Sequence, residues 1–154
     1  CPLRNQSNKN LIVCGDYGAN LSVFTSSNYF GLTSDFSEFE TVPLSAEQIR
    51  QPSETALIMD SGYALISWYN ASSDHAASLP LTTFTASAFI PGLSINSEKT
   101  IRTGLEYDAL NGRHRNRTVN AAFGDGHVEN KDSQQFLVEK QNDSYRNLSP
   151  LWKP

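Results

Sequence analysis

Residues 113–129 read RHRNRTVNAAFGDGHVE, and this stretch decides the fold. A basic turn around His114 leads into a short apolar run, and a second short run follows Gly124-Asp125-Gly126. Two strand-like runs joined by residues that tolerate a tight turn predict a β-hairpin over 117–131. Within that structural turn, the Asp125 carboxylate is expected to accept backbone N–H groups.

Outside this hairpin, apolar and alternating runs predict four more strands, and helix signals are few. The strands are expected at 11–14, 21–24, 55–60 and 63–69, the last two forming a second hairpin, with a turn at 15–18. A helix is expected over 97–110, where apolar residues recur four apart, with Asn111-Gly112 ending it. One helical turn is expected at 45–50, and a short helix capped by Asp132 is expected to run through Glu139.

The composition indicates one domain over residues 1–154, with many polar loops. Apolar residues make up 38% of the chain, charged residues 18%, and the net charge is -4. Nucleic acid is disfavoured as a partner because the charge is acidic and Arg113, Arg115 and Arg117 form only one local basic cluster. No apolar run is long enough to span a membrane, and no signal-peptide pattern is present. The abundance of Ser and Asn favours an extracellular protein.

Two cysteines, Cys1 and Cys14, bracket a polar segment. We predict a disulfide between them, which would close a loop of about 14 residues and contribute roughly 3 kcal/mol in the loop-entropy model. The alternative is two free thiols in a cytosolic protein. The sequence contains no Cys-x-x-Cys motif.

The cluster of His114, Asp125 and His127 allows two interpretations. As ligands, with Asp60 or Asp108 added, these residues could bind a divalent metal such as zinc. The simpler interpretation, which we favour, is structural: Asp125 holds the turn and His114 hydrogen-bonds across to a loop. We therefore expect no metal and no cofactor; calcium is a variant, although the sequence has no Asp-rich calcium loop.

Catalytic patterns are weak elsewhere. Asp60-Ser61-Gly62 lacks the flanking glycines of a nucleophile elbow, and Asp74-His75 has no matching serine spacing, so a hydrolase is disfavoured. Aromatic residues offer a glycan- or protein-binding platform as an alternative to a buried cluster under a loop; they are Tyr29, Phe30, Phe36, Phe39, Trp68, Tyr69 and Trp152.

Six Asn-x-Ser/Thr sequences are candidate glycosylation sites, which would be surface positions in a secreted protein. They start at Asn5, Asn20, Asn70, Asn116, Asn142 and Asn147. Chance occurrence in a chain rich in Asn and Ser is the favoured alternative.

Four separated blocks carry a family resemblance. They are Cys1-Pro2, Tyr17-Gly18-Ala19-Asn20, the segment from Pro52 to Ser61, and Arg113-His114 with Phe123-Gly124-Asp125-Gly126-His127-Val128-Glu129. In this order they resemble the C-terminal globular part of bacterial type IV pilin-like proteins with a His-(nine residues)-Asp-Gly signature. Ten residues, not nine, separate His114 from Asp125, and a turn or bulge must absorb the extra one.

The resemblance implies an α+β pilin-like head, with an antiparallel sheet, a few short helices and long loops. It implies a structural subunit of an extracellular type IV pilus-like filament or of a secretion pseudopilus, without enzymatic activity. The partners would be identical or related pilin subunits. The N-terminal apolar helix of such proteins is absent from this sequence, so the chain is expected to be shortened or to pair with a separate helix chain. The alternatives are an extracellular adhesion module and a metal-dependent enzyme.

Overall fold

The expected hairpin forms one margin of the main β-sheet in the computed structural model. Strand β4 covers Thr118–Phe123 and β5 covers Val128–Asp132, paired antiparallel from Thr118 opposite Asp132 to Ala122 opposite Val128. Burial alternates along β4, and Val119, Ala121 and Phe123 face the core. The prediction of a hairpin over 117–131 is therefore confirmed, because its two signals, alternation and a tight turn, are both local.

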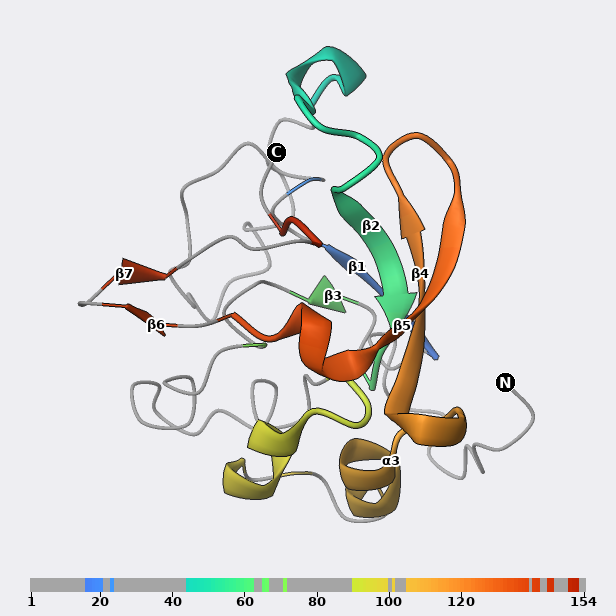
Figure 1. The fold of residues 1–154 in the computed structure, drawn as a ribbon, viewed down its shortest axis with the longest axis vertical. Helices are drawn as coiled ribbons and strands as arrows, with labels where there is room; N and C mark the ends of the chain where they lie inside the picture. The colour runs from blue at the N-terminus through green and yellow to red at the C-terminus, as the bar shows by residue number, and fades with distance from the viewer. Residues whose placement is uncertain are drawn as a thin grey trace, which may run out of the picture.

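The structure describes residues 16–20, 23, 44–62, 65–66, 71, 90–99, 101, 105–138, 140–141, 144–145 and 150–152. Within them, the main sheet has five strands in the order β3-β1-β2-β4-β5 (Figure 1). The remaining strands are β1, Tyr17–Asn20; β2, Ala56–Asp60; and β3, Leu65–Ile66. All neighbours run antiparallel except β1 and β3, which run parallel.

The second predicted hairpin, over 55–69, is wrong. β2 pairs with β1 and β4, and β3 pairs in parallel with β1. The strand β1 occupies residues where turn chemistry was expected, and Val23, inside the expected strand 21–24, is helical. Both errors arise because strand partners distant in the sequence leave no local signal, whereas Ser61-Gly62 suggested a turn. The expected strand at 11–14 lies outside the described residues.

The described helices are short. They are η2, Ala46–Gln48; η5, Ser94–Glu98; α3, Glu106–Asn111; η6, Arg115–Arg117; and η7, Ser133–Phe136, accompanied by a small β-ribbon of β6, Lys140–Gln141, and β7, Ser144–Tyr145. The helical turn expected at 45–50 is confirmed as η2. The short helix expected after Asp132 is present as η7, but it ends at Phe136 and not at Glu139. Its expected cap is confirmed, because the Asp132 carboxylate accepts the Gln134 N–H at 2.9 Å.

The single helix expected over 97–110 is wrong, because η5 ends at Glu98 and α3 begins at Glu106. Lys99 is extended, with φ -99° and ψ 145°. The Asn96 side chain, 1% exposed, donates to the carbonyls of Ile90 and Ala109, so it ties the two short helices together. A buried amide that satisfies two carbonyls favours two packed segments over one continuous helix.

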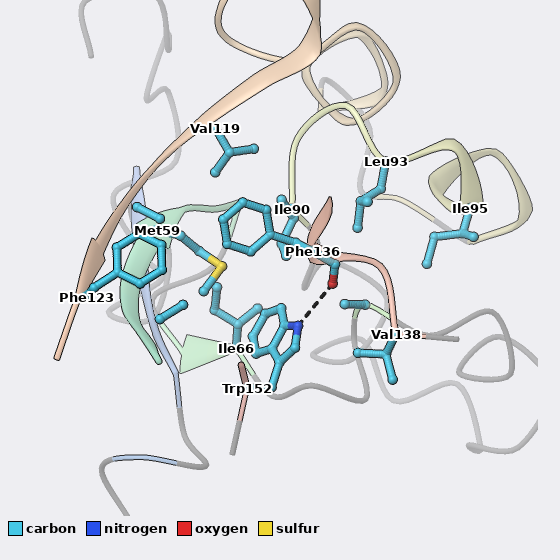
Figure 2. Close-up of a cluster of buried hydrophobic side chains, with 13 residues drawn as sticks. Met59, Ile66, Ile90, Leu93, Ile95, Val119, Phe123, Phe136, Val138 and Trp152 are labelled. Carbon is cyan, nitrogen blue, oxygen red and sulfur yellow. Dashed lines mark hydrogen bonds between the residues drawn. The ribbon is translucent and has the colours of Figure 1, made fainter. Parts of the chain in front are cut away.

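The core lies on one face of the sheet and beneath the C-terminal segments (Figure 2). Met59 and Phe123 project from the sheet toward Phe136 of η7 and toward Trp152. The Trp152 indole N–H donates to the Phe136 carbonyl at 3.0 Å, and the two rings meet edge to face. The remaining core members include Ile66, Ile90, Leu93, Ile95, Val119 and Val138.

The described residues therefore form an α+β structure, with the four strands β1, β2, β4 and β5 antiparallel and a few short helices beside them. This confirms the expected class in its coarse form. None of the helices within the described ranges has the length and apolar content needed to cross a bilayer.

Candidate functional site

Arg113 and His114 lie where the chain passes from α3 to the hairpin, and both side chains reach β2. The Arg113 side chain is 5% exposed. Its Nε donates to both carboxylate oxygens of Asp108, at 3.0 and 3.1 Å, and its terminal nitrogens donate to the carbonyls of Asp16 and Ser61. One guanidinium thus joins α3 to the residues that flank β1 and β2, which uses the planar fork that distinguishes arginine from lysine.

His114 joins the end of β2 to the centre of the hairpin. Its Nε2 lies 2.9 Å from Asp60 Oδ2 and 2.9 Å from Asn120 Nδ2. The same Asp60 oxygen accepts the backbone N–H of Asn120 at 2.7 Å, and the side chains of Asn120 and Asn130 bond at 2.8 Å. We call Asp60, Arg113, His114 and Asn120 the polar corner.

The chemistry of these groups fixes the proton on His114. Because Asp60 Oδ2 is an acceptor, the facing Nε2 must carry a hydrogen and donate. The Asn120 amide should then turn its oxygen, and not its nitrogen, toward the N–H of His114. If the amide groups of Asn120 and Asn130 both rotate by half a turn, the hydrogen bond between these two side chains is kept with donor and acceptor exchanged. The Asp60 side chain is 3% exposed and His114 33%, so a nearly buried carboxylate is held by a partly exposed imidazole.

The hairpin turn holds a second polar group. Asp125 Oδ1 accepts the His127 backbone N–H at 3.1 Å and lies 2.5 Å from His127 Nδ1. These bonds from His127, the backbone one first, lower the pKa of Asp125 below its ordinary 3.8. The His127 ring stacks flat on Phe123, with centroids 4.4 Å apart. This geometry supports the expected turn role of Gly124, Asp125 and Gly126.

Beyond the turn, β5 carries an ion pair between neighbouring side chains on one face. The Lys131 ammonium contacts Glu129 and lies 5.6 Å from the centre of the Phe123 ring. The hydrogen bond from Lys131 is the main cause that lowers the pKa of Glu129. Glu129 also lies 3.5 Å from His127 Nε2.

Ten residues separate His114 from Asp125, and the irregular backbone among them leaves the strand pairing intact. Asn116 and Arg117 adopt positive φ, 59° and 55°, inside η6, just before β4 begins. The β4–β5 register runs without a shift from Thr118 to Ala122. The irregular backbone therefore lies in the turn that precedes the strand, and the inward face of β4 is preserved.

The candidate metal ligands do not converge. His114 contacts Asp60 at the start of β4, whereas Asp125 and His127 lie past its end, and Asp108 is bound by Arg113. Across the described part of the chain, no three His, Cys, Asp or Glu side chains are arranged to hold a metal ion.

Other sequence candidates take different places. Asn20, one of the candidate glycosylation sites, is not a surface position in the folded chain: the residue is 0% exposed, and its side chain donates to the carbonyls of Ala56 and Trp152, both at 2.8 Å. Asn116 is exposed. Trp152 is 2% exposed and cannot form a surface platform.

Ser61, the candidate serine, is buried as well. The remaining candidates lie outside the described residues: Cys1, Cys14, Asn5, Asn70, Asn142, Asn147, Asp74, His75, Tyr29, Phe30, Phe36, Phe39, Trp68 and Tyr69.

Sequence reasoning missed Arg113, Asn20 and Asn96 as bridging residues. The only available signal at Arg113 was a basic residue directly after the helix stop at Gly112. The two asparagines had no such signal, because each bonds carbonyls distant in the sequence or in a separate helix. Their roles follow from burial alone.

Comparison with known proteins gives no match: no family model, no curated protein and no solved structure is similar to this chain.

Proposed function

We propose that this chain is the globular head of a pilin-like subunit, which acts by packing in an extracellular type IV pilus-like filament or secretion pseudopilus rather than by catalysis. The observation that carries the proposal is the contact between three of the four blocks of the resemblance; the first block, Cys1-Pro2, lies outside the described residues. Tyr17–Asn20 forms β1, the end of the segment 52–61 forms β2, and the last block spans the β4–β5 hairpin. These strands are adjacent in one sheet.

The polar residues of these blocks also bond to one another. Arg113 donates to Ser61, and His114 contacts Asp60. At the turn, Asp125 and His127 bond each other. Polar side chains that hydrogen-bond one another stabilise the fold, which supports a structural role over a catalytic one.

The proposal is tested in the producing bacterium with antibodies raised against this chain. Surface filaments are sheared from the cells, purified and labelled for electron microscopy. We expect the antibody to decorate filaments along their length, or to label short pseudopili when the secretion system is overproduced. Label confined to dispersed, non-filamentous protein would overturn the proposal.

Reading the coding sequence upstream of Cys1, or of its genetic neighbours, provides a second test. We expect a processed leader followed by about 20 apolar residues, enough to cross a bilayer as a helix, on the same chain or on a short partner chain. Absence of such a segment from both places would contradict a filament subunit.

A further inference from the structure

β5 is an edge strand that is exposed along most of its length. In the sheet order, β5 has β4 on one side and no described strand on the other. Figure 1 shows β5 along the right-hand margin of the sheet. Val128 is 67% exposed, and Glu129, Asn130 and Asp132 are exposed too. Such an edge presents backbone donors and acceptors that another strand can use.

The hairpin register identifies which backbone groups face outward. Phe123 N–H donates to the His127 carbonyl at 3.0 Å, so that pair is hydrogen-bonded. Bonded and non-bonded pairs alternate along an antiparallel ladder, which makes the Asn120–Asn130 pair non-bonded. Val128, Asn130 and Asp132 therefore direct their N–H and C=O groups away from β4, toward the open margin.

The side chains of β5 are complementary to those of a second copy of β5 that runs antiparallel to it. The strand reads Val-Glu-Asn-Lys-Asp, centred on Asn130. If two copies of β5 pair antiparallel with their Asn130 residues opposite each other, each Glu129 lies opposite the Lys131 of the other copy. A shift by two residues would place Glu129 opposite Glu129, or Lys131 opposite Lys131, and like charges directly opposite are destabilising.

We propose, as an extension of the structural function proposed above, that β5 is a contact between heads: two copies pair β5 antiparallel about Asn130. Val128, Asn130 and Asp132 exchange backbone hydrogen bonds, and two Glu129–Lys131 pairs fix the register. The contact is isologous, so both copies use the same residues. Its area is small, so the free heads associate weakly. Because a two-fold contact closes on itself, it joins heads in pairs, as between two filaments that lie side by side, and does not extend one filament.

The first experiment measures association of the 154-residue chain. Sedimentation equilibrium covers about 20 µM to about 1 mM, where an interface below standard size is detectable. Amide hydrogen exchange is followed by NMR at both ends of this range. We expect a dimer at high concentration and slower exchange there at Asn130. Glu129 and Lys131, which bond to β4, should be protected at both concentrations.

Two variants with matched controls test the geometry. Asn130→Pro removes an N–H that β4 does not use and should weaken dimerisation at least tenfold, whereas Asn130→Ala should leave it within threefold. Lys131→Glu should weaken it at least tenfold, and the double variant Glu129→Lys/Lys131→Glu should restore it to within threefold. Thermal unfolding of each monomer shows whether the fold is retained.

A chain that stays monomeric at about 1 mM, with fast Asn130 exchange throughout, would overturn the β5 contact. A dimer that is unaffected by both Asn130→Pro and Lys131→Glu would place the interface elsewhere and also overturn it. Neither result overturns the proposed function, because heads can assemble through other surfaces; that function is tested separately by the labelling of filaments. Loss of filament labelling with an intact β5 dimer would overturn only the proposed function.

Discussion

Arg113 bonds three segments that are distant in the sequence. Its guanidinium binds the Asp108 carboxylate with Nε and reaches the carbonyls of Asp16 and Ser61 with its terminal nitrogens. A lysine has the same charge, but its single ammonium cannot reach all three partners. The planar fork, more than the charge, is what the site requires.

We therefore predict that Arg113→Lys destabilises the fold by about 2–4 kcal/mol, because an ammonium in place of the nearly buried guanidinium loses at least one of its bonds to Asp108, Asp16 and Ser61. Urea unfolding followed by circular dichroism measures the change. Arg115→Lys is the matched control, because the Arg115 side chain is exposed, and it should change stability by less than about 0.5 kcal/mol. Equal effects for the two variants would contradict the role given to Arg113.

Two carboxylates of the hairpin have lowered pKa values, so both make stability depend on pH in the acid range. The pKa of Asp125 is lowered from 3.8 by bonds from His127, and the pKa of Glu129 from 4.5, mainly by Lys131. A group with a lower pKa in the folded chain contributes stability above its unfolded pKa and loses it as the pH falls through the folded value.

We predict that an NMR titration of the Asp125 carboxyl carbon gives a midpoint below 3.8 in the folded chain. The stability difference between the protein and Asp125→Asn should be constant above the unfolded pKa and should shrink as the pH falls below it. A midpoint at or above the ordinary value would show that the His127 bonds do not hold the carboxylate.

At the scale of elements, two glycines with nearly the same backbone angle lie in different surroundings. Gly92 has φ +88° and Gly126 φ +91°. A Cβ added at Gly92 would lie 3.0 Å from both Arg117 Cβ and Ser133 Oγ, whereas one added at Gly126 would meet nothing within 4 Å. The pair therefore separates the cost of the backbone angle from the cost of close packing.

We predict that Gly126→Ala destabilises the fold by roughly 1–2 kcal/mol, the cost of a left-handed angle. Gly92→Ala should cost about 1–3 kcal/mol more, because η6 and η7 must move apart to accept the methyl group. Thermal unfolding of both variants under identical conditions measures the difference. Similar losses would mean that the segment around Gly92 yields without strain.

At the scale of the whole molecule, Trp152 brings the C-terminal end of the described chain to the sheet. Its ring is 2% exposed, its indole N–H donates to Phe136, and its carbonyl accepts from Asn20 of β1. Next to it, Leu151 accepts a backbone hydrogen bond from Ala56, the first residue of β2, and donates one to Glu54, just before that strand. These contacts join the last described residues to the start of the sheet.

We predict that Trp152→Ala destabilises the fold by about 3–5 kcal/mol through the cavity that it leaves. Trp152→Phe keeps most of the apolar volume but removes the donor to Phe136, and it should cost about 1–3 kcal/mol. Denaturant unfolding, monitored by circular dichroism, measures both. A loss of stability below about 1 kcal/mol for the alanine variant would mean that the stability of the sheet does not depend on the packing of Trp152.

The sequence by itself determined the features whose hydrogen bonds are local. The alternation in β4, the tight turn at Asp125 and the Asp132 cap are each set within a few residues by side-chain sterics and nearby donors. For this reason the hairpin and the Asp132 cap of η7 were predicted correctly. The metal-ligand set drawn from the same stretch does not converge, because the length of β4 separates His114 from Asp125.

Only the tertiary structure decided the pairings between distant segments. β1 lies between β2 and β3, His114 meets Asp60, and Asn20 is buried against Trp152. Local propensity at these residues was neutral or pointed to turn and surface. Burial of one sheet face and the need to satisfy each buried polar group selected the partners, and both depend on the whole chain being folded.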